Sequence, residues 1–476
     1  MSASDGQTRL WLALGTLGIA LWTWLRWAGG ADLPLVGWDT FPLIAAGRVG
    51  SVGDVLGAFG DELMGGRYPL GSYWRPLVHL SFGLDHALGG LDPATFHRTD
   101  LALAVLGAVL AAEAARRWLA GGANAIWSAL AAGLVYGTNL VHADIVDVPA
   151  RRADSLAVVF TLFALCCALS RTRPARWIAA VAVAAALASK ESGAIAVVVV
   201  TGVHFVSASG AFAERLRAAA REAWPAWVAF ALTFALRTWA LGGIGGSREA
   251  QMSAAWSESF GAFVRYFPAA FAPAPARLLG SATISCGVAL ALVVMLAIAA
   301  RREFLKSFGP LALWFVALAS LTAISRAERG WYELPFVAIN ALFVAALVSR
   351  TLDSAGFLRV LALPAAAWVA LSLLPWPTRT STFLEATSAA RNYLARLEST
   401  VRAARPGVAS RLPGLPMEVR DPAPWLDGRP RTYALLAPYS VSAFAELAWP
   451  ARNLRIVPPA QPSPPLADEI VIVLER

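Results

Sequence analysis

Apolar runs of about 20 residues recur between residues 10 and 374, and short polar segments separate them. A helix of that length spans the hydrocarbon core of a bilayer, which is about 30 Å thick. Only 15% of the residues are charged, whereas a soluble domain has about 25%. The sequence therefore predicts an all-α polytopic membrane protein with about 11 transmembrane helices.

The positions of the basic residues relative to these apolar runs indicate how the chain is oriented in the membrane. The net charge is +9, which in a soluble protein would suggest a nucleic-acid partner. Here the basic clusters at residues 116–117, 171–176, 215–221 and 301–306, and Arg350, lie in the short segments that follow every second run, and the positive-inside rule explains that pattern better. We predict a multi-pass protein of the inner or plasma membrane with a cytoplasmic N-terminus, partnered by the lipid bilayer and by no nucleic acid.

Two long polar regions give the domain organisation. The first is an extracytoplasmic loop of residues 30–98, within a transmembrane domain of residues 1–376. Short amphipathic helices are predicted in this loop at residues 51–63 and 76–88. The second is a proline-rich region of residues 377–476, which predicts a small extracytoplasmic α/β domain and contains no candidate for chemistry. The spacing of the cysteines indicates neither a disulfide framework nor a metal site.

The first loop contains a candidate base and a candidate anion-binding residue. Asp39 follows Trp38, and a carboxylate near aromatic surface has a raised pKa, which suits a general base. The alternative is a solvated loop aspartate. Arg75 follows Tyr73 and Trp74, and its guanidinium suits bidentate recognition of phosphate. The alternative for Arg75 is an anchor at the membrane interface.

The densest polar cluster is the segment HADIVDVPARRAD, residues 142–154. Helix capping explains part of it, since Asp154 can cap the following helix. So many titratable groups in a short outer turn exceed what capping needs, and Asp144 is the leading candidate. Arg152 is a second candidate for phosphate binding, and His142 and Asp154 are expected to support the site.

Two more charged segments lie on the same side of the membrane. Lys190 and Glu191 interrupt an apolar stretch of residues 177–206, which therefore predicts two short helices that meet at this pair. A charge at membrane depth costs roughly 2.5–3.5 kcal/mol and marks a functional candidate, although both residues could simply cap helix ends. Arg329 and Tyr332 lie in the segment RAERGWYE, which could bind an anionic head group or form only local ion pairs.

These motifs together resemble the GT-C class of polytopic membrane glycosyltransferases. The resemblance is to the protein O-mannosyltransferase-like branch that includes the transmembrane and tetratricopeptide-repeat O-mannosyltransferases. It covers residues of about 10–350 and rests on five motifs in order, GWDTFPLI, YWRPLVHLSFGLDHALGGLDPATFHRTDLAL, LVYGTNLVHADIVDVPARRADSLAVVF, ASKESGAIAV and RAERGWYELPFVAINALF. The chain departs from the family in two respects: Thr40 stands where many relatives have a second acidic residue, and the C-terminal repeats are absent.

The resemblance implies a hexosyl- or pentosyltransferase of the cell envelope. The donor would be a polyprenyl-phosphate-linked sugar, and the acceptor, an unknown glycan, lipid or protein, would meet it on the extracytoplasmic face. Asp39 matches the catalytic carboxylate of the first loop, and Asp144 matches an acidic position that is usually Glu. The other matches are to charged family positions: Arg75, Arg152, Asp154, Lys190, Glu191 and Arg329.

The chemistry of a lipid-phosphate sugar suggests the mechanism. Asp39 would take the proton of the acceptor hydroxyl, and direct displacement would invert the anomeric centre. Arg75, Lys190 or Arg329 would stabilise the departing phosphate. A divalent cation between Asp39 and Asp144 is compatible with the sequence but not required by it. The alternatives are a transporter or flippase of lipid-linked sugars and a catalytically degenerate relative.

Overall fold

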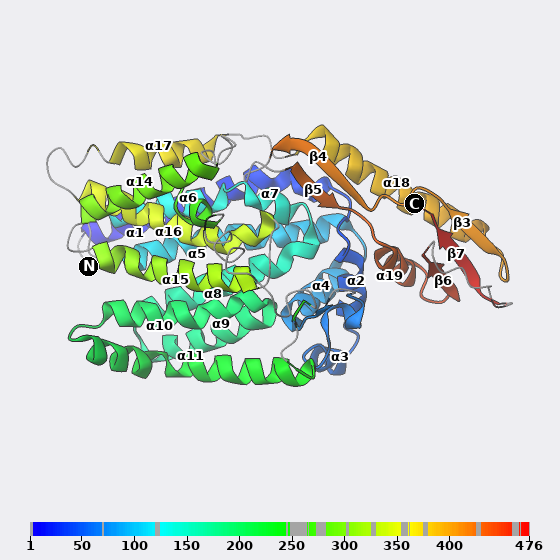
Figure 1. Cartoon of the computed structure of the whole chain (residues 1–476), viewed down its shortest axis with the longest axis horizontal. Helices are drawn as coiled ribbons and strands as arrows, with labels where there is room; N and C mark the ends of the chain where they lie inside the picture. The colour runs from blue at the N-terminus through cyan, green and yellow to red at the C-terminus, as the bar shows by residue number, and fades with distance from the viewer. Residues whose placement is uncertain are drawn as a thin grey trace.

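The computed structural model is mostly helical. It describes residues 3–68, 71–119, 124–243, 246–247, 264, 266–272, 282–300, 304–324, 330–353, 360, 362–374, 379–424, 430–458, 466 and 468–475. Long helices run side by side in a bundle, and a smaller α/β region lies beyond one end of it (Figure 1). This arrangement confirms the helical class predicted from the sequence, while the number of transmembrane spans stays a prediction.

The bundle consists mainly of long helices. Its helices are α1 (Ala3–Trp27), α5 (Pro93–Trp118), α6 (Ala125–Gly137), α8 (Arg152–Ser170), α9 (Arg173–Ser189), α10 (Ile195–Ser207), α11 (Phe212–Ala240), α14 (Ala282–Ala300), α15 (Phe304–Ile324), α16 (Leu334–Leu352) and α17 (Ala362–Leu373). Short elements link several of them, namely η1 (Ala28–Asp32), α7 (Val141–Val146), η3 (Pro149–Arg151), η4 (Glu191–Ala194) and η6 (Gly330–Glu333).

Local sequence explains where several of these helices begin. At α5 the Asp92 side chain accepts a hydrogen bond from the Ala94 amide, and Pro93 occupies the first turn. At α9 the Thr172 hydroxyl accepts from the Ala175 amide in the same way. Because each cap satisfies a backbone N–H that has no partner within the helix, these two helices begin at defined residues.

Helix α16 is the centre of the bundle. Its side chains are buried along nearly its whole length, against α5, α6, α8, α14, α15 and α17. Two helical segments are long and apolar enough to cross a membrane, residues 149–170 and α16 itself, and five shorter apolar helices accompany them among the described residues. Large apolar side chains of α1 and α11, such as Leu17, Leu232 and Trp239, lie exposed, as lipid-facing residues would.

The first loop covers one end of the bundle. Its elements are α2 (Thr40–Gly47), α3 (Val52–Gly57), η2 (Leu63–Gly66), β1 (Gly71–Ser72) and α4 (Pro76–Gly89). The structure thus confirms both predicted loop helices, the first of them in a shorter form. Helices α2 and α4 touch through their backbones, because a Cβ atom at Gly83 would lie 1.9 Å from the Gly47 carbonyl oxygen. Strand β1 pairs antiparallel with β2 (Gly246–Ser247).

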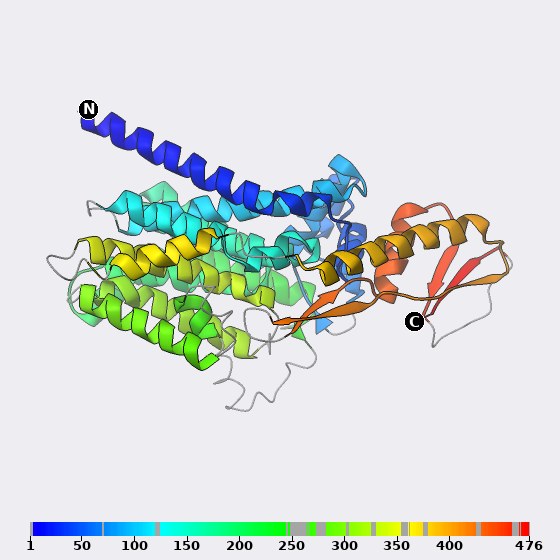
Figure 2. The ribbon, with the colours of Figure 1, turned by 90° about the horizontal axis from the view of Figure 1, so that it is seen from above.

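The C-terminal region lies against this loop and extends the molecule beyond it (Figure 2). Its helices are α18 (Ser381–Ala403) and α19 (Pro438–Ala448), and its strands are β3 (Ala409–Leu412), β4 (Glu418–Pro424), β5 (Pro430–Ala434), β6 (Leu454–Val457) and β7 (Ile470–Leu474). Strands β3, β7 and β6 form a parallel sheet in that order, and β4 pairs antiparallel with β5. Apolar side chains of the loop and of this region form one continuous core.

Candidate active site

Asp39 lies where the loop, the bundle and the C-terminal region meet. It occupies the cap position of α2, yet its carboxylate makes no capping hydrogen bond. Instead its Oδ1 accepts a hydrogen bond of 2.8 Å from the hydroxyl of Tyr439, at the start of α19. Burial raises the pKa of Asp39, while the Tyr439 hydrogen bond and the charge of Arg75 act in the opposite direction. The result is a half-buried carboxylate of increased basicity.

Arg75 precedes α4 and points toward the bundle. Its Nη2 donates a hydrogen bond of 2.8 Å to Oε2 of Glu191. The guanidinium carbon lies 4.7 Å from the centre of the Tyr73 ring, within the range of a cation–π contact. Both members of the ion pair keep part of their side chains accessible, so the guanidinium is oriented but not enclosed.

Lys190 and Glu191 lie at a sharp break between two helices. Helix α9 ends at Ser189 and α10 begins at Ile195, which confirms the prediction of two short helices. The turn between them folds tightly onto α9, because a Cβ atom at Gly193 would lie 2.0 Å from the Ala186 carbonyl oxygen. The break presents both charged side chains at the covered end of the bundle.

The Lys190 ammonium group contacts a carboxylate and an aromatic ring. Its Nζ lies 2.6 Å from Oδ1 of Asp154, in the first turn of α8. It also lies 4.2 Å from the centre of the Tyr332 ring, in η6. The predicted residues Lys190, Asp154 and Tyr332 are therefore in direct contact, although they come from three separate parts of the chain.

Electrostatic interactions connect these contacts into one cluster. Arg75 interacts with Asp39, Lys190 and Tyr332 in addition to its partner Glu191. The structure thus brings together six of the predicted site residues, namely Asp39, Arg75, Asp154, Lys190, Glu191 and Tyr332. Carboxylate and cations converge from different elements, as an acid/base site for an anionic substrate requires.

The other predicted residues have different surroundings. Arg152 is completely buried, with Nη1 2.7 Å from Asp85 and Nε 2.7 Å from Asp100. The His142 ring lies 3.0 Å from the Tyr136 carbonyl oxygen. Asp144 forms an ion pair of 3.2 Å with Arg151, and it is not among the hydrogen-bond or charged partners of Asp39 in the described part of the chain. Arg329 lies outside the described residues, and the roles of all four stay predictions.

Three residues of the cluster have no counterpart in the sequence prediction. Arg237 is buried in the last turn of α11 and interacts electrostatically with Arg75 and Glu191. A lone charge near the end of an apolar run is a signal that could have identified it. Tyr68, which interacts with Asp39, and Tyr439 lie in unremarkable polar sequence. No sequence signal marks these two tyrosines.

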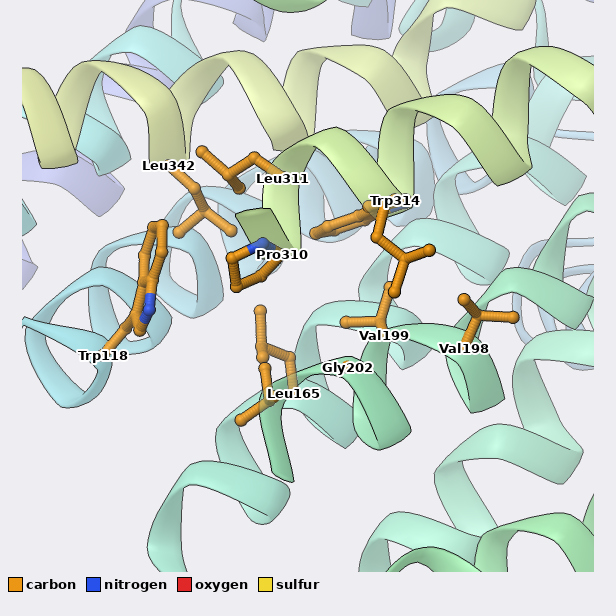
Figure 3. Close-up of a pocket in the computed structure, with 11 residues that line it drawn as sticks. Trp118, Leu165, Val198, Val199, Gly202, Pro310, Leu311, Trp314 and Leu342 are labelled. Atoms are coloured by element: carbon orange, nitrogen blue, oxygen red, sulfur yellow. The ribbon is translucent and has the colours of Figure 1, made fainter. Parts of the chain in front are cut away.

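No group of three or more His, Cys, Asp or Glu side chains is placed to hold a metal ion in the described part of the chain. The cation that the sequence leaves open therefore has no ready ligand set there. An apolar cavity lies among α5, α8, α10, α15 and α16 (Figure 3), and its lining, which includes Trp118, Leu165 and Trp314, contains no residue of the cluster.

Comparison with known proteins gives partial matches. No family model matches the chain. The protein O-mannosyl-transferase Tmtc2 of Drosophila melanogaster is 35% identical over 105 residues, which are 22% of this chain and 10% of that protein. TMTC2 of Mus musculus is 34% identical over 94 residues, 20% of this chain and 11% of its own. The chain thus matches about a tenth of the length of these curated relatives, and the predicted resemblance to this family is confirmed over that part.

Among solved structures, the crystal structure of ArnT from Cupriavidus metallidurans in the apo state is similar to the chain. The sequence identity is 17% and the TM-score is 0.48, with 84% of this chain and 73% of that chain covered.

Proposed function

We propose that this chain is an integral membrane glycosyltransferase of the GT-C type. It moves a sugar from a polyprenyl-phosphate donor to an acceptor hydroxyl on the extracytoplasmic face, with inversion. One observation carries the proposal: a half-buried carboxylate, Asp39, lies in the same cluster as the cations Arg75 and Lys190, at the covered end of a helical bundle. The partial similarity to curated protein O-mannosyl-transferases supports the same reaction class.

The reaction requires one proton transfer and one displacement. Asp39 accepts the proton of the acceptor hydroxyl as its oxygen attacks the anomeric carbon of the sugar. The bond between that carbon and the phosphate oxygen breaks with both electrons remaining on the phosphate. Arg75 and Lys190 stabilise the negative charge that develops there. Attack and departure on opposite faces of the carbon invert its configuration.

The partners of the two cations contribute to this arrangement. Glu191 and Asp154 hold the guanidinium and ammonium groups at fixed positions before substrate binds. Preorganised charges need little rearrangement when the phosphate leaves, which is how electrostatic stabilisation lowers a barrier. The same partners compensate charges that would be costly to keep alone near the bilayer.

A transporter or flippase of lipid-linked sugars predicts a different distribution of charge. Such proteins place polar groups along a central pathway and bind substrate near the middle of the membrane. The cluster around Arg75 instead lies at the end of the bundle where α2, α4 and α19 gather (Figure 1). This placement favours chemistry at the membrane surface over passage through the bundle.

The test is sugar transfer by membranes that contain the chain. Labelled polyprenyl-phosphate sugars are supplied with detergent-solubilised glycan, lipid and peptide acceptors, and the product is measured by mass spectrometry. We expect Asp39→Asn to reduce kcat by about 10²–10⁴-fold. The matched control is Asp32→Asn, an exposed aspartate seven residues earlier in the same loop, which should retain activity. Undiminished transfer by Asp39→Asn would overturn the base assignment, and no transfer from any donor would favour transport or a degenerate relative.

A further inference from the structure

The C-terminal region is hydrogen-bonded to the two loop residues that precede Asp39. The Gly37 amide donates a hydrogen bond of 2.9 Å to the Leu435 carbonyl oxygen. The Trp38 indole donates one of 2.7 Å to the Met417 carbonyl oxygen. Backbone and side-chain contacts from a distant segment therefore fix the residues immediately before the candidate base.

Helix α19 packs directly on the helix that begins at Asp39. The rings of Phe41 in α2 and Phe444 in α19 meet edge to face at 5.0 Å. Glu446 of α19 forms ion pairs with Arg48 and Arg67 of the loop. These contacts place the first turn of α19, and with it Tyr439, beside the Asp39 carboxylate.

Asp39 stands at a position where an aspartate normally caps its own helix. A capping carboxylate accepts from the amide of the second or third helical residue, and the third residue of α2 is Pro42, which has no amide hydrogen. The carboxylate makes no capping bond and is bound by Tyr439 instead. Because Pro42 offers no amide hydrogen, a capping hydrogen bond to Asp39 could come only from the Phe41 amide. The hydrogen bond from Tyr439 therefore has less competition from within α2.

We propose that Tyr439 is a positioning residue, through which the C-terminal region holds one oxygen of Asp39 and leaves the other to receive the acceptor proton. The inference rests on the proposed role of Asp39 as base. It assigns a function to a region in which the sequence indicates none. Loss of the hydroxyl frees the carboxylate to turn toward the Phe41 amide of its own helix, away from the acceptor.

The groups that face the Asp39 carboxylate determine how its pKa changes when the Tyr439 hydroxyl is removed. In the described part of the chain they are the Tyr439 hydroxyl from α19, the Arg75 guanidinium before α4 and the Tyr68 phenol after η2. Burial raises the pKa of Asp39, whereas the Tyr439 hydrogen bond and Arg75 lower it. Removal of the hydroxyl therefore raises that pKa further, so the base stays protonated up to a higher pH.

The experiment compares Tyr439→Phe with Tyr393→Phe. Tyr393 is a buried tyrosine of α18 in the same region, and its hydroxyl lies 3.5 Å from the Leu412 carbonyl oxygen. For Tyr439→Phe we expect the acidic limb of kcat/KM to move upward by about one pH unit, as loss of a hydrogen bond to a carboxylate predicts. We expect kcat to fall about tenfold with the donor KM unchanged. Tyr393→Phe should leave the limb in place.

A second readout does not depend on activity. A water-soluble carbodiimide reacts with the protonated carboxyl group, so the modification of Asp39, measured by mass spectrometry, decreases as the pH rises through its pKa. The midpoint should lie higher in Tyr439→Phe than in the wild type and in Tyr393→Phe. Coincident midpoints in all three would overturn the inference, even where transfer by the wild type supports the proposed function. A wild type without transfer would refute the proposed function, and the midpoints would still decide whether Tyr439 controls Asp39.

Discussion

Two groups of charged residues belong to the covered end of the bundle, and they differ in what surrounds each cation. Within the described residues Arg75 forms an ion pair with one carboxylate, that of Glu191, and 17% of its side chain is exposed. Arg152 has two carboxylate partners, Asp85 and Asp100, and none of its side chain is exposed. Its guanidinium carbon also lies 4.3 Å from the centre of the Phe82 ring.

The difference separates a binding cation from a structural one. A guanidinium enclosed by two carboxylates can accept a phosphate only by losing one of them, which would leave an unpaired buried charge. A guanidinium with one partner and an exposed edge has donors left for a ligand. The same residue type is thus expected to stabilise the fold at position 152 and to bind substrate at position 75.

The largest effect expected from this contrast is a loss in the free energy of unfolding when Arg152 is replaced. Arg152→Met leaves Asp85 and Asp100 buried without their cation, and removal of one partner from such a group costs about 3–5 kcal/mol. The measurement is thermal unfolding of the purified protein in detergent. Adding Asp85→Asn and Asp100→Asn should restore part of the loss. An Arg152→Met protein of normal stability that has lost only transfer would place Arg152 in the active site after all.

The second prediction concerns activity rather than stability. Arg75→Gln should reduce kcat by about 10²–10³-fold, the usual cost of one electrostatic contact to a transition state. It also leaves Glu191 without its 2.8 Å partner, so a double variant with Glu191→Gln is the matched control. The double variant should recover stability but not activity. Recovered activity would show that the pair acts only in folding.

The sequence could predict helices better than contacts. The break at Lys190 and Glu191 and the helix at residues 76–88 follow from local patterns, and the structure has α9, α10 and α4 there. The pairings were not predictable, because the partners are far apart in the chain. Arg75 and Glu191 are separated by 116 residues, and Lys190 and Asp154 by 36. Only the folded bundle shows which carboxylate belongs to which cation.

The site itself was predictable to the extent that polar residues interrupt apolar sequence. That signal identifies Asp39, Arg75 and Lys190, because a charge near a membrane is costly and stands out. It cannot identify Tyr439, which lies 400 residues from Asp39 in an ordinary polar region. Nor does it separate Arg152 from Arg75, since the two differ in burial and number of partners, which are properties of the fold.

The pH dependence of transfer should report the pKa of Asp39 and not the buried ion pairs of Arg152. Burial raises the pKa of Asp39 above the usual range of an aspartate, and a base works only when it is ionised. Transfer should therefore decline as the pH falls through that raised pKa, which a profile of kcat/KM from about pH 4 to about pH 8 would show. If the residual activity of Asp39→Asn kept the same acidic limb, the limb would belong to another group.

The smallest effect is expected at the outer edge of the interface between α19 and the loop. Glu446 pairs with Arg48 and Arg67, and all three side chains are at least 38% exposed. Exposed pairs contribute about 0.2–1 kcal/mol each, and salt screens them. Glu446→Gln should thus lower the unfolding temperature only slightly at low salt, with no change at high salt and no shift of the acidic limb. A shift of the limb as large as that of Tyr439→Phe would mean that overall docking of α19, rather than the Tyr439 hydroxyl, sets the basicity of Asp39.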